Sequence, residues 1–167
     1  LPRGSVAFAH EREVVIAGGG REWRGTEERA DFPKAGAEGA GRRVLRLRRL
    51  LGPHEVDRVL EHACSAVLEY NNNPDSVDGK PTYETYFMVE AQHVPGGLRD
   101  VIRPIVAERI QPYVRERYGC SEATVCTCLL RRYLPGERRA HPAHYDIDAY
   151  CTVVVGLNPG DFDGGLY

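Results

Sequence analysis

The residues best suited to chemistry are His144 and Asp146, which stand two positions apart in the chain. On an extended strand, residues i and i+2 project from the same face, so an imidazole nitrogen and a carboxylate oxygen would point to one place. Such a pair forms part of the two-histidine, one-carboxylate set that binds iron(II) and leaves other positions open. The tripeptide alone is a weak signal, because His-x-Asp often arises by chance.

The residues around this tripeptide make the signal more specific. A Tyr-Leu-Pro-Gly segment begins upstream at Tyr133, an apolar segment with a threonine spans Cys151–Leu157, and Asp-Gly-Gly-Leu follows at 163–166. This order resembles the double-stranded β-helix (jelly-roll) core of the prolyl 4-hydroxylase-like dioxygenases, which depend on iron(II) and 2-oxoglutarate. The resemblance covers most of residues 44–167, and its specific motifs are confined to the last part of that range.

The resemblance implies a role for each matched residue. His144 and Asp146 would be iron(II) ligands. Tyr133 would bring its hydroxyl to the 2-oxoglutarate, and Thr152 would lie under that co-substrate. Plain β-propensity is an alternative explanation for the threonine, and packing is an alternative for the tyrosine.

Residues 80–87 lie where the family has a mobile loop that closes over the substrate, and Tyr83 and Tyr86 could stack on a peptide there. The implied reaction is hydroxylation of a peptidyl prolyl residue or a related substrate. It is coupled to decarboxylation of 2-oxoglutarate to succinate, with ascorbate as an optional reductant. The partner would be a peptide, a protein or a small molecule.

Two departures from the family pattern stand out. Several members place a second 2-oxoglutarate-binding tyrosine four residues beyond the threonine, where this chain has Gly156. In addition, no histidine, arginine or lysine follows His144, so the distal histidine ligand and the cationic anchor of the co-substrate are missing. Because the usual facial set has three protein ligands, we expect the sequence to be part of a longer protein.

Two non-catalytic alternatives stay open. The first is a zinc-binding interaction module, with ligands drawn from two histidines and three cysteines, although Cys-x-Cys is not the usual zinc knuckle. The second is a degenerate oxygenase fold that serves as a protein-binding scaffold. The candidate zinc ligands are Cys126, Cys128, His141, His144 and Cys151.

Charge and hydropathy exclude some partners. The formal net charge is −2, so no general attraction to nucleic acid or to anionic membrane is expected. No apolar run reaches the roughly eighteen residues that a transmembrane helix needs. Because the first five residues resemble an expression-tag remnant, we expect the native N-terminus to be trimmed, and the localisation stays open with a cytoplasmic or nuclear location slightly favoured.

The elements that must position these residues favour an α+β fold with a jelly-roll core, N-terminal supporting helices and missing C-terminal strands. Residues 1–5 (LPRGS) resemble an expression-tag remnant, residues 6–43 are predicted as a glycine-rich loop segment, and residues 44–167 as a partial oxygenase domain. Periodicity predicts helices at 53–70 and 98–118, the second interrupted near Pro104 and Pro112. It predicts a loop running into a strand at 80–90 and strands at 44–51, 124–133 and 150–157, the last one central and covered.

Overall fold

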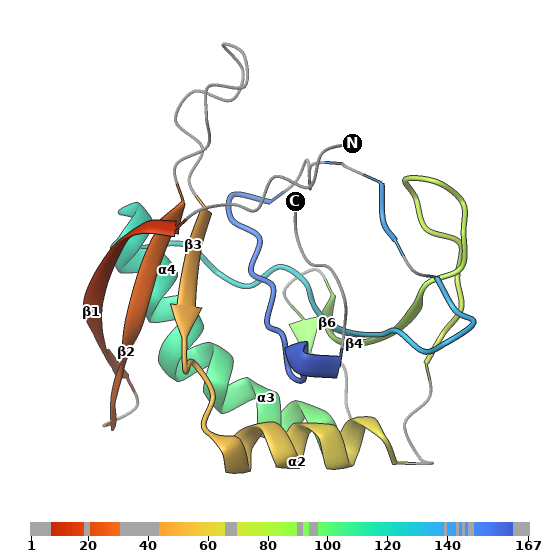
Figure 1. Cartoon of the computed structure of the whole chain (residues 1–167), viewed down its shortest axis with the longest axis horizontal. Helices are drawn as coiled ribbons and strands as arrows, with labels where there is room; N and C mark the ends of the chain where they lie inside the picture. Colours follow the sequence, from red (N-terminus) through yellow and green to blue (C-terminus); the bar gives the residue numbers. More distant parts are fainter. Residues whose placement is uncertain are drawn as a thin grey trace.

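A computed structural model describes residues 8–18, 21–30, 44–65, 70–89, 92–93, 97–138, 140–142, 144, 146 and 149–161 of the chain. The fold is mixed α+β, as predicted, with two three-stranded antiparallel sheets and a long interrupted helix (Figure 1). None of the described helices is long and apolar enough to cross a membrane. The strands are β1 Phe8–Gly18, β2 Arg21–Ala30, β3 Val44–Arg48, β4 Tyr83–Val89, β5 Gln92–His93 and β6 Cys128–Arg132. The helices are α2 Pro53–Ala63, α3 Gly97–Ile105, the π-helix Val106–Ile110, α4 Gln111–Tyr118 and the short 3₁₀ turn Pro159–Asp161.

The first sheet has the order β1-β2-β3 and corrects the prediction of a loop over residues 6–43 for residues 8–18 and 21–30, while the rest of that range lies outside the described residues. Within the described residues, β1 and β2 pair from Phe8 with Ala30 to Gly18 with Arg21. The charges that suggested a loop are cross-strand partners, because Arg12 lies opposite Glu27 and donates to it at 2.7 Å. Opposite charges facing each other stabilise an antiparallel pair, so a charge-rich segment can still be a strand.

Glu27 fastens this sheet to α4. Its side chain is only 3% exposed, and it accepts hydrogen bonds from Arg12, from the Tyr113 hydroxyl and from Arg117. Burial alone would raise the pKa of Glu27, but these hydrogen bonds and the two arginines lower it. The same face of the sheet contributes Val14 to a cluster with Tyr113, so the charged contact borders an apolar one.

β3 matches the predicted half-buried strand, since its residues alternate between exposed and half-buried. Leu45 and Leu47 pack against the cluster under the first sheet. Arg46 and Arg48 project to the opposite face, where both pair with Glu28. The arginines are therefore not simply solvated, because they cover a carboxylate that is 1% exposed.

α2 is shorter than predicted, because it ends at Ala63 and the Cys64 N–H bonds the Leu60 carbonyl. Pro53 opens the helix, where its missing N–H costs nothing, and Glu55 accepts from the Gly52 N–H at 2.8 Å. The predicted extension beyond Ser65 falls partly on residues 66–69, which lie outside the described residues.

The predicted interruption of the second helix is confirmed. A π-helical turn joins α3 to α4, and the Gln111 N–H donates to the Val106 carbonyl, five residues back. Such turns accommodate a helix whose hydrogen-bond ladder is broken, and Pro104 and Pro112 flank this one. Gly119 then ends α4 with a φ of 65°, a left-handed conformation that glycine adopts readily.

The second sheet has the order β5-β4-β6, with β4 in the centre. The prediction of a loop running into a strand over 80–90 is confirmed, since β4 begins at Tyr83 and pairs with β6 from there. Tyr83–Phe87 therefore do not form the mobile loop that the resemblance implied. Phe87 is 6% exposed and packs with Val59 of α2 and with Leu98 and Val101 of α3. This second cluster includes Leu157 at its margin.

The segment Cys151–Leu157 is extended, but no described residue pairs with it as a strand. Val153 and Val154 are 46% and 65% exposed, so the predicted central, covered strand is wrong. Figure 1 draws this blue segment as a trace without an arrow. A strand needs neighbours that take its backbone hydrogen bonds, and β-propensity alone did not supply them.

Candidate metal centre

A turn after β6 leads the chain toward the candidate site. Gly136 has a φ of 89°, and the Glu137 N–H donates to the Leu134 carbonyl at 3.0 Å. The Glu137 carboxylate accepts from the Leu134 N–H at 2.9 Å and from Arg132 of β6 at 2.6 Å. The turn is thus tied to the sheet, which sets the direction of the following segment.

His144 Nε2 lies 3.5 Å from Asp146 Oδ1, although neither residue belongs to a described strand, so the strand geometry that the prediction assumed is not what brings them together. The other ring nitrogen, Nδ1, lies 2.8 Å from the Pro142 carbonyl oxygen. A carbonyl oxygen only accepts, so Nδ1 must carry the proton in that hydrogen bond. In the neutral ring, Nε2 then presents its lone pair toward the carboxylate.

This arrangement fits a cation between the two groups. A nitrogen lone pair and a carboxylate oxygen are both electron donors, so two such groups 3.5 Å apart could serve as two ligands of one metal ion. With metal–ligand bonds of about 2.0–2.2 Å, two ligands of one ion lie roughly 3–3.5 Å apart. The observed separation is at the upper end of that range, and nitrogen plus carboxylate suits iron(II).

Thr152 contacts a predicted metal ligand directly. Its hydroxyl donates to Asp146 Oδ2 at 2.6 Å, while Oδ1 is the oxygen nearer to His144. Hydrogen bonds from neighbouring groups commonly orient metal-binding carboxylates. The contact to 2-oxoglutarate predicted for Thr152 remains a prediction, since the described contact is with the carboxylate.

Tyr133 follows β6 directly and is 37% exposed. Burial on its own would lower the pKa of Arg131, but side-chain hydrogen bonds with Tyr133 and Glu84 raise it. The Tyr133 side chain is thus held beside a guanidinium. Its predicted role toward 2-oxoglutarate stays a prediction.

Tyr83 and Tyr86 lie on β4 and are half-buried. The Arg132 guanidinium stands 5.1 Å from the centre of the Tyr83 ring, so one aromatic face already has a cation as neighbour. The Tyr86 hydroxyl donates to Glu84 at 2.8 Å, and burial together with that carboxylate raises the pKa of Tyr86 to about 12. Stacking of either ring on a substrate remains a prediction.

Asp75 is a neighbour of the site that sequence reasoning missed, and it contacts His141, which the sequence offered only as a candidate zinc ligand. The His141 ring centre lies 5.1 Å from that of His144, and its Nε2 lies 3.1 Å from Asp75 Oδ2. Burial and the nearby Arg131 lower the pKa of His141. Pro142 in the sequence argued against His141 as a ligand, but no local signal linked it to a residue so far upstream.

The five candidate zinc ligands are not assembled. Cys126 is exposed, whereas Cys128 and Cys151 are half-buried. Burial raises the pKa of both half-buried thiols. Among the described residues, no three side chains of histidine, cysteine, aspartate or glutamate are placed to hold one metal ion.

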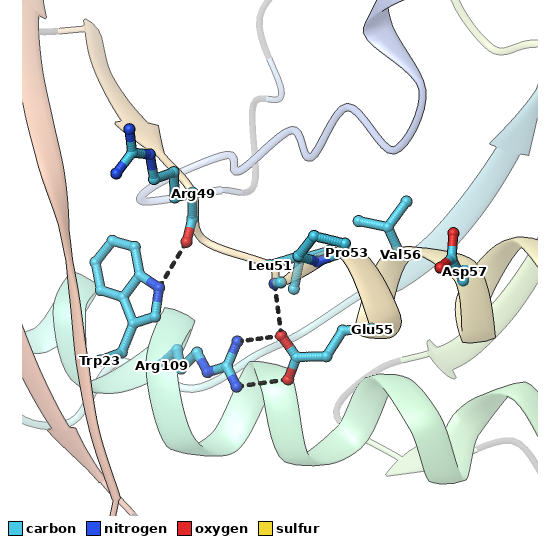
Figure 2. A pocket seen from close by; sticks show the side chains of 9 residues that line it. Trp23, Arg49, Leu51, Pro53, Glu55, Val56, Asp57 and Arg109 are labelled. Atoms are coloured by element: carbon cyan, nitrogen blue, oxygen red, sulfur yellow. Dashed lines mark hydrogen bonds and ion pairs between the residues drawn. The ribbon is translucent and has the colours of Figure 1, made fainter.

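An open depression of about 790 Å³ lies where α2 begins (Figure 2). There Arg109 donates to both oxygens of Glu55 at 2.5 and 2.7 Å, and Trp23 Nε1 donates to the Arg49 carbonyl at 2.6 Å. The first contact joins α2 to the π-helix, and the second joins β2 to the turn that follows β3. The lining includes none of the predicted site residues, so the depression is separate from the candidate metal centre.

Comparisons with protein-family models, with curated proteins and with solved structures found no match to the chain.

Proposed function

We propose that the chain carries the first two metal ligands of an iron(II)- and 2-oxoglutarate-dependent oxygenase. The observation that supports this most is the pairing of His144 and Asp146 at 3.5 Å, with the His144 Nδ1 proton held by the Pro142 carbonyl. That tautomer frees Nε2 as a ligand. The finer architecture, a jelly-roll core, and hydroxylation of a peptidyl prolyl residue or a related substrate are part of the same proposal.

Each residue then has a defined task. His144 would supply a neutral nitrogen and Asp146 a negatively charged oxygen, and Thr152 would hold the carboxylate so that one oxygen faces the histidine. Bound iron(II) would supply the place where 2-oxoglutarate and oxygen meet and the oxidising chemistry. Tyr133 would contribute a polar contact to the 2-oxoglutarate, and Gly156 offers no side chain to share that task.

The first test is metal binding to the 167-residue chain. Titration with Mn(II), followed by electron paramagnetic resonance of the free ion, should show one site in the wild type. His144→Ala and Asp146→Ala should each abolish it, whereas His54→Ala, which changes an exposed histidine on α2, should not. Equal binding in all four proteins would contradict the proposal.

The second test is turnover. In the native protein, release of succinate from 2-oxoglutarate should require both iron(II) and oxygen, and Asp146→Ala should abolish it because the only assigned carboxylate ligand is gone. The 167-residue chain alone should bind metal without turnover, since it supplies two ligands where three are usual. Wild-type turnover in Asp146→Ala would overturn the assignment.

One observation favours a second candidate, a catalytically inactive oxygenase fold that binds a protein. Tyr150 and Val154 are 70% and 65% exposed on one extended segment, and contiguous exposed apolar side chains often mark interaction sites. This candidate predicts no turnover in the native protein even with iron(II), oxygen and 2-oxoglutarate present. Succinate release would exclude it.

A further inference from the structure

A tight turn far upstream of the metal ligands contacts the segment that leads to them. The Asp75 N–H donates to the Lys80 carbonyl, and the Gly79 N–H donates to the Asp75 carbonyl, both at 2.8 Å. Gly79 has a φ of 70°, which favours glycine at that position. The turn is closed by its own backbone, so the direction of the Asp75 side chain is set.

Both oxygens of the Asp75 carboxylate have neighbours. Oδ1 accepts from the Val77 N–H at 2.8 Å, and Oδ2 lies 3.1 Å from His141 Nε2. Both side chains are largely buried, at 10% and 14% exposed. His141 Nε2 forms no hydrogen bond among the described residues, so Asp75 acts on the ring through its charge, whose attraction is stronger in a setting with little water than at the surface.

A second ion pair holds the same turn to the segment before His141. Arg138 is 6% exposed, donates to Asp78 at 2.7 Å and donates to the Ala140 carbonyl at 2.8 Å. Arg138 also lies 3.9 Å from Asp75 Oδ2, so the residues leading to the metal ligands are tied to both carboxylates of the turn. Of these contacts, that of His141 with Asp75 is the one whose ring lies beside His144.

The His141 ring lies on the ring of His144, with centres 5.1 Å apart and planes inclined by 44°. A rotation of the His144 ring would break the bond from Nδ1 to the Pro142 carbonyl at 2.8 Å and would change the contact between the two rings. His141 thus limits the orientations of the ring that presents Nε2 toward Asp146.

We propose that Asp75 and His141 are a positioning pair, in which Asp75 holds His141 and His141 holds the ring of His144 in its metal-binding orientation. The role of this orientation in metal binding rests on the proposed function. The positioning itself does not, because it concerns the ring in the metal-free chain. Loss of such supporting contacts typically weakens metal binding by about 10–100-fold.

The binding test uses the 167-residue chain and Mn(II). His141→Ala should weaken binding by about 10–100-fold, and Asp75→Asn should weaken it by a smaller factor. His141→Phe keeps a ring beside His144 but cannot bind Asp75, so it should fall between the wild type and His141→Ala. Asp78→Asn is the matched control, since it breaks the other ion pair of the turn and should leave affinity unchanged.

A second readout needs no metal. Long-range proton–nitrogen NMR spectra of the ¹⁵N-labelled chain report which ring nitrogen of His144 carries the proton, with His144→Ala to assign the signals. The wild type should show the Nδ1–H form, and His141→Ala should show a mixture of both forms. His141→Phe answers the same question if the alanine variant does not fold, which circular dichroism would reveal.

The outcomes separate the two ideas. If the wild type binds no Mn(II) but His144 loses its single tautomer in the His141 variants, the proposed function fails and the positioning pair stands. If the wild type binds Mn(II) and neither the affinity nor the tautomer changes in His141→Ala and His141→Phe, the positioning pair is wrong. If Asp78→Asn weakens Mn(II) binding as much as His141→Ala does, the positioning pair is also wrong, since the turn rather than His141 would then be responsible.

Discussion

Thr152 offers the sharpest test of how the candidate site is built, because two roles predict different results. If its hydroxyl serves Asp146, as the 2.6 Å contact indicates, Thr152→Val should weaken metal binding while keeping the shape of the side chain. If it serves only the 2-oxoglutarate, metal binding should not change.

The magnitude follows from the contact. A hydrogen bond to a charged group contributes about 1.5–3 kcal/mol, but the Asp146 side chain is 46% exposed, so water replaces part of the lost bond. We therefore expect about 1 kcal/mol, which corresponds to roughly a five-fold higher dissociation constant for Mn(II).

The assay is the Mn(II) titration of the 167-residue chain, with two comparison variants. Thr152→Ser retains the hydroxyl and should bind Mn(II) nearly as well as the wild type. Thr127→Val removes an exposed hydroxyl whose described contact is with the Cys126 sulfur at 4.0 Å, and it should have no effect. Unchanged affinity in Thr152→Val, or equal losses in Thr152→Val and Thr127→Val, would refute the assigned contact.

Three further predictions concern stability and the co-substrate. Glu27→Gln should lower the free energy of unfolding by about 2–3 kcal/mol, measured by urea denaturation with the fluorescence of the single tryptophan. Glu22→Gln, which breaks an exposed ion pair, should change it little. Hydrogen bonds and nearby arginines outweigh burial and lower the pKa of Glu27. The difference in unfolding free energy between the wild type and Glu27→Gln should therefore be fully present above about pH 4.3, the pKa of glutamate in the unfolded chain. It should shrink as the pH falls through the lower pKa of Glu27 in the folded state. A difference that does not change with pH would contradict this. Gly25→Ala should destabilise the first sheet by about 1–3 kcal/mol, because a Cβ there would lie 2.2 Å from the Trp23 ring, and unchanged denaturation would argue against that packing. Tyr133→Phe in the native protein should raise the Michaelis constant for 2-oxoglutarate by roughly ten- to a hundred-fold without changing iron affinity. Steady-state kinetics and an iron titration measure the two quantities. An unchanged Michaelis constant with a loss of iron affinity would show that Tyr133 has a different role.

Local chemistry in the sequence was enough to predict several elements. Pro104 and Pro112 cannot donate backbone hydrogen bonds, so an interrupted helix followed from their spacing alone, and Gly119 marked its end. The alternation of leucine with arginine predicted β3. Likewise, the two-residue spacing of His144 and Asp146 was sufficient to expect that they lie together.

Other features depended on partners that are distant in the chain. β1 and β2 are rich in charge and read as a loop, because the groups that neutralise Glu27 and Glu28 come from β1, β3 and α4. Conversely, the apolar segment Cys151–Leu157 had strong β-propensity but found no pairing strand among the described residues. Hydrogen-bond partners, rather than side-chain preference, decided both cases.

The candidate site divides in the same way. The sequence by itself determined which donors could bind a metal and that they share one place, since both properties follow from residue type and spacing. Only the tertiary structure decided the orientation of the His144 ring, the contact of Thr152 with Asp146 at 2.6 Å and the approach of Asp75 to His141 at 3.1 Å. The physical reason is that such contacts join groups whose separation is set by the folding of intervening segments, and no local pattern encodes that distance.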